Sequence, residues 1–427
     1  MNKMQMDEYL DYVNTFGIVP GLDNMRQLIS ELSNPLEGIK VIHVAGTNGK
    51  GSISSMLAHI IAQTGRRVGI YNSPALFNVC ETIRFSMSEE KELKCIEENE
   101  YYRCLEAVIL KAKHLNLQKT YPTKFEIETA TAFVAFKEHN CEFAIIETGM
   151  GGKEDATNVI DNPIATVIAS ISMDHMAYLG NTIEEIAKNK CGIFKRNVPA
   201  FISASNNEIK ETIARCAAQM ECEVSFSDEK CLSIKEHTLE HVLFDYKGIG
   251  NVKINTGALY QTDNVMTVID LILKLTDKGL INANETDIKK GIDKFVWKGR
   301  FEIIDKNPLV IADGAHNPAA ARLLAQTIEG IDMKKKPILL MAVYKDKAYK
   351  EILKIMKNVS DSIICTDVGE ARALKAEILF ECAKEYYSKT ILESNFSKAL
   401  EKGKEIAMRE DRALLCFGTL SMMKYID

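Results

Sequence analysis

Short apolar runs alternate with longer amphipathic segments along most of this chain. An apolar run bounded by turn residues is typical of a buried strand, whereas apolar positions that recur every three or four residues are typical of a helix. In the first half of the chain the pattern predicts strands at 39–45, 67–71, 143–147, 164–170 and 200–203, and helices at 54–63, 125–138 and 182–188. Strands that are joined by helices favour a mostly parallel sheet.

The pattern changes over residues 222–256, where short apolar stretches alternate with polar residues and turn signals. We expect antiparallel strands there, at the edge of the first domain, then a helix at 263–274 and a domain junction at 295–301. From residue 309 the first pattern returns, with strands at 309–312, 338–343, 362–366 and 413–417 and helices at 318–329, 347–357, 373–387 and 396–408. This C-terminal part is predicted to be a Rossmann-like, doubly wound α/β domain.

The composition is that of a globular protein and excludes disordered, collagenous and membrane-embedded chains. Apolar residues make up 46% and charged residues 26% of the 427 residues, and the formal net charge is −6. A mildly acidic chain has no global electrostatic reason to bind nucleic acid or an anionic membrane. The 11 cysteines form no Cys-x-x-Cys pair, and the N-terminus lacks the apolar core of a signal peptide. We expect a cytoplasmic enzyme with small-molecule substrates and without nucleic-acid or membrane partners.

The strongest local motif is a glycine-rich run directly after the first predicted strand, Gly46-Thr47-Asn48-Gly49-Lys50-Gly51-Ser52. Glycines allow backbone N–H groups to close around phosphate oxygens, and the following helix N-terminus favours negative charge. Lys50 would bridge phosphate oxygens, and Ser52 would reach a metal-bound phosphate. The alternative is a glycine-rich turn with a surface lysine. The motif predicts an N-terminal P-loop ATPase-like domain, with a parallel sheet plus a small antiparallel sheet, over residues 1–296, and leaves 297–427 for the C-terminal domain.

Polar residues follow other predicted strands of the first domain. Glu147 ends an apolar strand and precedes three glycines, which is a position where Mg²⁺ is often held, although a solvated carboxylate also fits. His175 follows the next strand and would be a ligand or a base, but a lone histidine is more often structural. Lys190, by charge pattern alone, is a solvated residue at a helix end.

In the second domain, polar residues follow the strand at 309–312 and open a helix. Asp313 and His316 stand where a ligand would lie, whereas Asn317 and Pro318 are also explained as a helix cap. Arg300, at the domain junction, would contact a phosphate, or else is an ordinary surface residue.

Together and in this order, these motifs resemble the Mur ligase superfamily, and most closely the folylpolyglutamate synthase family with its bifunctional dihydrofolate synthase members. The matching segments are 43–52, 73–74, 125–126, 147–152, 155–158, 174–175, 179–180, 190–193, 299–302 and 313–318. The resemblance implies an ATP-dependent amide ligase that adds L-glutamate to folates, and also to dihydropteroate, through an acyl phosphate. It also implies a monomer, Mg²⁺ at two sites, and carbamylation of Lys190.

The resemblance assigns roles to individual residues. Residues implied to bind ATP are Thr47, Asn48, Gly49, Lys50, Gly51, Ser52, Asn264, Arg300 and Asp313. Residues implied to hold metal are Ser73, Glu147 and His175. The catalytic set is Lys50, Lys190, His175 and His316. Substrate-lining residues are Thr123, Lys124, Phe125, Glu126, Glu154, Asp155 and Ala156.

The chain departs from the family pattern at three places, which leaves open which carboxylate substrate receives the glutamate. The family's Thr-Ser-Pro-His-Leu is Asn-Ser-Pro-Ala-Leu at 72–76, its Trp-Pro-Gly-Arg is Trp-Lys-Gly-Arg at 297–300, and Lys124 replaces an apolar residue. A ligase for another amino acid and carboxylate, such as a cell-wall precursor, is an alternative. Residues 1–38 are too few for the UDP-binding domain of such enzymes. A regulatory nucleotide-binding module is a second alternative, but it would not be expected to retain Glu147, His175 and Lys190.

Overall fold

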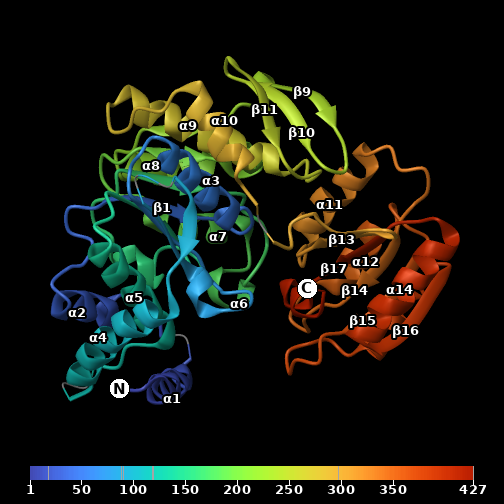
Figure 1. The fold of residues 1–427 in the computed structure, drawn as a ribbon, viewed down its shortest axis with the longest axis horizontal. Coiled ribbons are helices and arrows are strands. Elements are labelled where there is room, and N and C mark those ends of the chain that lie inside the picture. Colours follow the sequence, from blue (N-terminus) through green and yellow to red (C-terminus); the bar gives the residue numbers. More distant parts are fainter. Residues whose placement is uncertain (18, 88, 90, 118–119, 297, 427) are drawn as a thin grey trace. The chain divides into compact units, whose positions relative to one another are not determined.

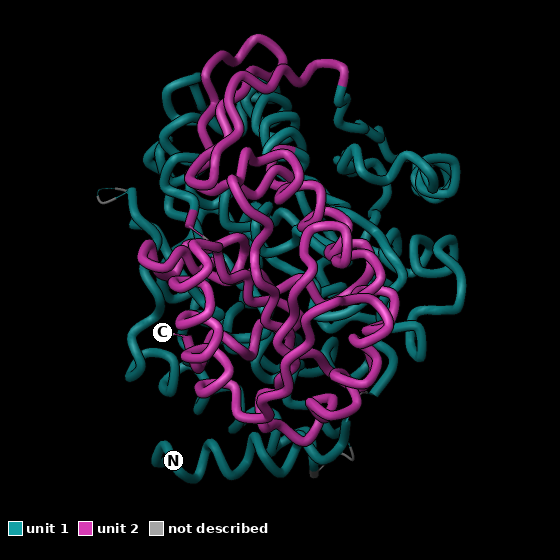
Figure 2. The backbone as a smooth tube through the Cα atoms, turned by 90° about the vertical axis from the view of Figure 1, so that its right-hand side faces the viewer, with its two compact units in different colours: residues 1–229, 263–295 teal, residues 230–262, 296–427 magenta. Residues whose placement is uncertain are grey.

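The computed structural model describes residues 1–427 except 18, 88, 90, 118–119, 297 and 427. The chain divides into two compact units (Figure 2): residues 1–229 with 263–295, and residues 230–262 with 296–427. Residues 230–262 are part of the second unit, and they include most of the segment 222–256 that we expected at the edge of the first domain. Residue 297, where we placed the start of the second domain, lies outside the described residues, and the bounds 1–296 and 297–427 stay a prediction.

Unit 1 is built on an eight-stranded sheet in the order β4-β3-β2-β5-β1-β6-β7-β8. The parallel strands are β2 (Val68–Tyr71), β5 (Phe143–Glu147), β1 (Lys40–Ala45), β6 (Ala165–Ile168), β7 (Ala200–Ile202) and β8 (Val224–Phe226). At one side of the sheet β3 (Ile83–Ser86) and the edge strand β4 (Leu93–Cys95) pair antiparallel, and neither was predicted. The predicted parallel strands are confirmed, but β8 pairs parallel with β7, not in an antiparallel sheet.

Helices cover both faces of this sheet (Figure 1). On one face α1 (Lys3–Asn14), α2 (Asp23–Glu31), α4 (Glu98–Leu117) and α5 (Lys124–Glu138) contribute to one apolar cluster with β1, β2 and β5. The others are α3 (Lys50–Gln63), α6 (Met176–Leu179), α7 (Ile183–Lys190), α8 (Lys210–Gln219), α9 (Gln261–Asp277) and α10 (Glu285–Asp293). Gly291 lets α10 lie directly against the backbone of Ile60 in α3. Short 3₁₀ turns lie at Val79–Thr82, Ala156–Val159, Cys191–Ile193, Ala204–Ile209, Glu229–Cys231 and Leu420–Tyr425.

Unit 2 contains two sheets. The smaller is antiparallel, with β10 (Val242–Tyr246) between β9 (Leu232–His237) and β11 (Ile249–Ile254). The larger has the order β12-β13-β17-β14-β15-β16, and all its pairs except β12–β13 are parallel. Its strands are β12 (Glu302–Lys306), β13 (Leu309–Asp313), β14 (Ile338–Met341), β15 (Ser362–Asp367), β16 (Lys389–Asn395) and β17 (Leu414–Phe417). Its helices are α11 (Pro318–Gly330), α12 (Tyr349–Met356), α13 (Ala376–Ala383) and α14 (Phe396–Glu410).

The small sheet belongs to unit 2 because the segment after it packs against the domain that follows in sequence. Ala258 shares an apolar cluster with Phe301 and with residues of β13 and β17. The hydroxyl of Thr256 donates to the carbonyl oxygen of Phe301 at 3.2 Å, and a methyl group on Gly257 would collide with the same residue. These contacts arise between residues about 45 positions apart, which sequence periodicity cannot reveal.

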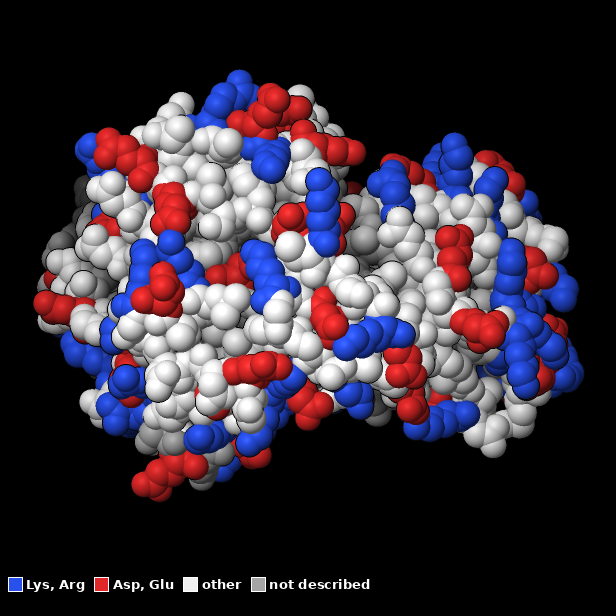
Figure 3. Space-filling view, turned by 90° about the horizontal axis from the view of Figure 1, so that it is seen from above, with Lys and Arg blue, Asp and Glu red and all other residues white. Residues whose placement is uncertain are grey.

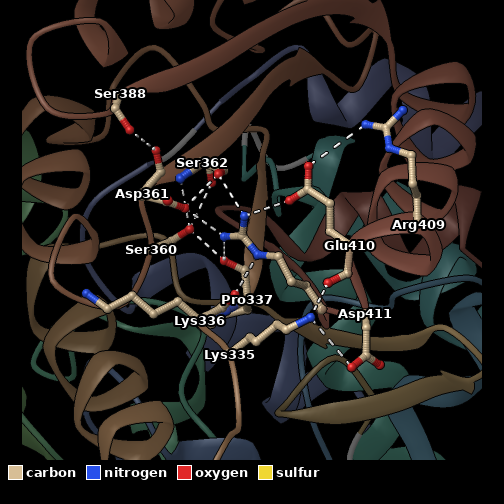
Figure 4. A network of polar contacts seen from close by, with 11 residues as sticks. Lys335, Lys336, Pro337, Ser360, Asp361, Ser362, Ser388, Arg409, Glu410 and Asp411 are labelled. Carbon is tan, nitrogen blue, oxygen red and sulfur yellow. Dashed lines mark hydrogen bonds and ion pairs between the residues drawn. The ribbon is translucent and has the colours of Figure 1, made fainter.

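Arg412 links residues at the amino ends of the parallel strands in unit 2, and its partners Lys336, Pro337, Asp361, Ser362 and Glu410 are labelled in Figure 4. Its guanidinium donates to the carbonyl oxygens of Lys336 and Pro337, to the carboxylates of Asp361 and Glu410, and to the hydroxyl of Ser362. Only 8% of the Arg412 side chain is exposed. Since β14, β15 and β17 each begin just after one of these residues, the cluster lies opposite the carboxyl ends of the strands.

Across the described part of the chain, no helix is long and apolar enough to cross a membrane. On the face shown in Figure 3, lysine and arginine side chains are interspersed with aspartate and glutamate.

Candidate functional site

The glycine-rich run forms a tight loop between β1 and α3. Gly46 has φ 156° and Gly49 has φ 89°, and α3 begins at Lys50, four residues before the predicted start. A methyl group on Gly49 would meet the side-chain oxygen of Asn264 in α9, and one on Gly46 would meet Ala169. The backbone of the loop therefore lies against Asn264, a residue that the sequence resemblance assigned to ATP binding. Ser52 is buried in the first turn of α3.

The segment after β6 holds this loop in place. The backbone N–H of Thr47 donates to the carbonyl oxygen of Ser170, and the Thr47 hydroxyl exchanges hydrogen bonds with the backbone of Ser172. The hydroxyl of Ser170 donates to the carbonyl oxygen of Asn48 at 3.1 Å. These hydrogen bonds attach Thr47 and Asn48, on the β1 side of the loop, to the segment that follows β6.

Lys50 and Glu147 lie together at the carboxyl ends of neighbouring strands. The Lys50 ammonium is 3.8 Å from Glu147 Oε1 and 3.3 Å from the carbonyl oxygen of Gly46. The other carboxylate oxygen of Glu147 accepts a 2.7 Å hydrogen bond from the amide of Asn72, and Arg84 donates to that amide at 2.8 Å. Our sequence analysis singled out neither Asn72 nor Arg84 as a site residue.

Lys190 is buried at the end of α7, with only 3% of its surface exposed. Its amine donates to the carbonyl oxygen of Gly46 at 2.7 Å. Burial, together with the positive charge of Lys50, lowers the pKa of Lys190 to about 7. The interpretation of Lys190 as a solvated helix end, which followed from charge pattern alone, is wrong, because the side chain is enclosed beside the phosphate loop.

The remaining candidate metal ligands are less enclosed than Glu147. His175 is exposed and has φ 51° directly before α6. Its backbone N–H donates a hydrogen bond to the carboxylate of Asp174. Ser73 is half-buried in the loop after β2, before a cis proline. No cluster of three or more His, Cys, Asp or Glu side chains suited to a metal occurs among the described residues. Mg²⁺ needs only one or two protein carboxylates beside phosphate and water oxygens, so Glu147 next to a phosphate loop fits this ion.

The candidate substrate residues at 123–126 begin α5. Thr123 and Glu126 form a reciprocal helix cap, in which the Glu126 carboxylate accepts from both the backbone and the hydroxyl of Thr123. Burial raises the pKa of Glu126. The ring of Phe125 occupies the space that a methyl group on Gly149 would need, whereas Lys124 pairs with Glu128 within the helix. This cap gives Thr123 and Glu126 a structural role of their own.

Asp155 organises the loop that follows Glu147. Its carboxylate accepts from the backbone N–H groups of Met150 and Thr157 and from the Thr157 hydroxyl. Since that hydroxyl gives its hydrogen to Asp155, the ring nitrogen of His43, 2.7 Å away, must donate to it. Burial lowers the pKa of His43 to about 3 and raises that of Asp155. Of the flanking candidates, Glu154 is exposed and Ala156 lies in the apolar core.

In unit 2 the candidates gather around Asp313 at the end of β13. Its buried carboxylate accepts hydrogen bonds from the backbone N–H groups of Phe301 and Ala315 and from the hydroxyl of Tyr260 at 2.6 Å. Burial raises the pKa of Asp313, and the charge of Arg300 opposes that rise. His316 is half-buried and bonds through Nδ1 to the carbonyl oxygen of Gly314. The sequence analysis missed the role of Tyr260.

Asn317 caps α11, as the alternative interpretation expected. Its side chain accepts from the backbone N–H of Ala320, and Pro318 is the first helical residue.

A phosphate loop, an adjacent carboxylate and a second α/β unit are features of a nucleotide-dependent ligase, and family models agree. The Mur ligase middle domain matches residues 44–271, and the Mur ligase, glutamate ligase domain matches residues 299–420. The fold and site therefore define a ligase of the Mur type. The chain belongs to the dihydrofolate synthase/folylpolyglutamate synthase family of Mur ligases, which confirms the resemblance seen in the sequence.

Three known proteins illustrate the match. Dihydrofolate synthase/folylpolyglutamate synthase of Bacillus subtilis is 31% identical over 378 residues, covering 86% of each chain. Folylpolyglutamate synthase of Mycobacterium tuberculosis, solved with ADP, superimposes with a TM-score of 0.87 at 26% identity, covering 98% of this chain and 96% of the other. Escherichia coli FolC, solved with DHPP and ADP, gives a TM-score of 0.83 at 25% identity, covering 99% and 96%.

Proposed function

We propose that the chain is an ATP-dependent ligase that joins the amine of L-glutamate to a carboxylate of folates and of dihydropteroate through an acyl phosphate. The observation that carries this proposal is the convergence of Lys50, Glu147 and Lys190 on one phosphate loop. The names of the relatives support the acceptor class, and the ADP bound in two of the similar structures supports ATP as the energy source.

The phosphate loop would hold and polarise ATP. Backbone N–H groups from Asn48 to Gly51 would surround its phosphates, and Thr47 would hold the loop through its hydrogen bonds to Ser170 and Ser172. Ser52 would add a hydroxyl at the start of α3, and Asn264 would contact adenine. The Lys50 ammonium would neutralise charge that builds up on the transferring phosphoryl group, which is the main contribution a protein makes to phosphoryl transfer. The family resemblance assigns Arg300 and Asp313 to ATP binding and His316 to catalysis, and these roles are part of the proposal.

The residues around Glu147 fit a divalent cation. Glu147, Ser73 and His175 would hold Mg²⁺, which supplies electrostatic stabilisation of phosphate charge when bound. Two such sites are part of the proposal. Glu147 supplies the single buried carboxylate, and its orientation is fixed by hydrogen bonding.

Lys190 is proposed to react with CO₂ to give a carbamate. The reaction needs a neutral amine, and a pKa near 7 makes that form abundant at neutral pH. The carbamate would replace a buried cation, which is repelled by Lys50, with anionic oxygens that suit a neighbouring metal. Burial of the Lys190 nitrogen beside Gly46 supports this assignment.

The acceptor is proposed to lie along 123–126 and 154–156. Two residues of this set have well-defined contacts. The Phe125 ring packs against Gly149, and the Asp155 carboxylate accepts a hydrogen bond from the backbone N–H of Met150. Lys124 and the missing histidine at position 75 are the features expected to change the preference between dihydropteroate and reduced folates. A Mur ligase acting on a different carboxylate is the alternative.

A cytoplasmic, monomeric enzyme completes the proposal. All 11 cysteines are free thiols, which fits a reducing compartment, and the family resemblance supports a monomer. Analytical ultracentrifugation would test the oligomeric state.

The test is glutamate-dependent ADP release by the purified protein with ATP and Mg²⁺. Dihydropteroate is supplied in one reaction and tetrahydrofolate in another, and the masses of the products are determined by mass spectrometry. A product carrying one added glutamate in both reactions supports the bifunctional enzyme, and product from tetrahydrofolate alone narrows the function to chain extension. No product from either acceptor contradicts the folate assignment.

A further inference from the structure

Asn72 bridges two oppositely charged residues across three strands of the unit 1 sheet. It follows β2, which lies between β3 and β5. Its amide oxygen accepts from Arg84 of β3 at 2.8 Å, and its amide nitrogen donates to Glu147 of β5 at 2.7 Å. Asn72 is 6% exposed, so both hydrogen bonds are sheltered from water.

The chemistry of the two neighbours fixes the orientation of this amide. A guanidinium only donates hydrogen bonds and an ionised carboxylate only accepts them, so the oxygen of Asn72 must face Arg84 and its nitrogen must face Glu147. A threonine, which the family pattern has at this position, carries one hydroxyl on a shorter side chain. It lacks the two separate polar atoms that reach both neighbours at once.

The bridge restricts Glu147 to one orientation. One carboxylate oxygen is bound to Asn72, and the other is directed to within 3.8 Å of the Lys50 ammonium. Residues that hydrogen-bond to a metal ligand typically change metal affinity 10- to 100-fold when they are removed. Arg84 donates to the amide oxygen of Asn72, and its positive charge also interacts with Glu147.

We propose that Asn72 is a positioning residue that orients Glu147 for the divalent cation accompanying the nucleotide, and that Arg84 contributes by holding the Asn72 amide. This inference rests on the proposed function, because it assumes that Glu147 binds the cation.

The test compares ADP binding with and without Mg²⁺ by titration calorimetry. In Asn72→Ala, and in Asn72→Thr as a milder variant that keeps a polar group, we expect ADP affinity without Mg²⁺ to stay within about twofold of wild type. The gain in affinity on adding Mg²⁺ should fall about 10-fold or more. Asn207→Ala, an exposed asparagine elsewhere in unit 1, is the matched control and should change neither value.

A double-mutant cycle tests whether the effect of Arg84 on Glu147 depends on Asn72. Arg84→Met alone should reduce the Mg²⁺-dependent gain, and in the Asn72→Ala background it should reduce that gain less than it does alone, because its hydrogen bond to the amide is already lost and only its charge near Glu147 is removed. Additive losses, or an equal loss of ADP affinity with and without Mg²⁺, would overturn the proposal.

Ligase turnover of the wild-type protein separates this inference from the proposed function. A wild-type protein that makes no folate product, but whose Mg²⁺ response still depends on Asn72, would support the bridge and contradict the function. Normal turnover of the wild-type protein, together with an unchanged Mg²⁺ response in both Asn72 variants, would support the proposed function and contradict the role of Asn72.

Discussion

The amine of Lys190 donates a 2.7 Å hydrogen bond to the carbonyl oxygen of Gly46, the first residue of the phosphate loop. These residues are 144 positions apart, and the contact joins the end of α7 to the end of β1. It places a buried, titratable nitrogen directly against the backbone that is proposed to bind phosphate. The following two predictions depend on this arrangement.

Replacing Lys190 with methionine should change how stability depends on pH. The pKa of Lys190 is about 7 in the folded chain, against 10.5 for a free lysine, so between these values the unfolded state holds a proton that the folded state lacks. The stability of wild type relative to Lys190→Met should therefore rise with pH across this window, by at most about 1.4 kcal/mol per pH unit, and be flat below it. Denaturant unfolding in CO₂-free buffer from pH 6 to pH 10 measures this difference. A relative stability that falls with pH contradicts the assignment.

Lys190→Ala should lose ligase activity, and small carboxylic acids should restore part of it. The deletion leaves a space beside Gly46 into which formate or acetate can bring anionic oxygens. We expect a loss of about 100-fold or more, as when a catalytic group is removed, and a saturable recovery with added acetate. Product formation is measured against acetate concentration, with chloride salt as the control. Full activity of Lys190→Ala without any carboxylate would refute the carbamate.

Lys50→Ala should abolish phosphoryl transfer while the fold persists. The Lys50 ammonium is the positive charge of the loop nearest to Glu147, and its loss should lower turnover about 100- to 1,000-fold. Lys137→Ala, which removes an exposed lysine of α5, should leave turnover unchanged. ADP release and the circular dichroism melting curve are measured for both. Near-normal turnover of Lys50→Ala would contradict the phosphate-loop assignment.

Comparing Gly49→Ala with Gly65→Ala separates the effect of backbone strain from that of a steric clash with Asn264. Both glycines have positive φ, at 89° and 79°, but only Gly49 has a neighbour, Asn264, where the new methyl group would stand. Each substitution should cost about 1–2 kcal/mol of stability from backbone conformation. Gly49→Ala should cost more and should also weaken ADP binding, whereas Gly65→Ala should bind ADP normally. Equal effects of the two on ADP binding would show that Asn264 is not the cause.

Arg412→Ala should destabilise unit 2 by about 1–3 kcal/mol, because the carbonyl oxygens of Lys336 and Pro337 and the carboxylates of Asp361 and Glu410 lose their donor. Arg412→Lys should recover less than half of that loss, since a single ammonium cannot reach all the partners that surround a planar guanidinium with several N–H donors. Arg409→Ala removes a side chain that is 73% exposed and should change stability by less than about 0.5 kcal/mol. Thermal unfolding ranks the three variants. An Arg412→Ala protein as stable as wild type would contradict the role given to this cluster.

Much of the fold and the phosphate loop could be predicted because their signals are local. Gly46 to Ser52 lie within seven positions, between an apolar strand and a helix, and the buried parallel strands are continuous apolar runs. The edge strand β16 was missed because its exposed residues alternate only weakly in polarity.

The Asn72 bridge could not be predicted for a different reason. It depends on the register of three strands whose residues are 12 and 75 positions apart. Burial of Lys190 likewise depends on a contact with Gly46 that charge pattern along α7 cannot reveal.

The interleaving of the two units along the chain has a consequence for how the protein is made. Unit 1 is complete only once residue 295 has been synthesised, and by then residues 230–262 of the other unit have already been synthesised. Their contacts with Phe301 form later still. A truncated product ending at residue 296 would therefore carry an apolar surface with no covering segment. Splitting the chain into halves that fold independently requires removing 230–262 from the first half and attaching it to the second.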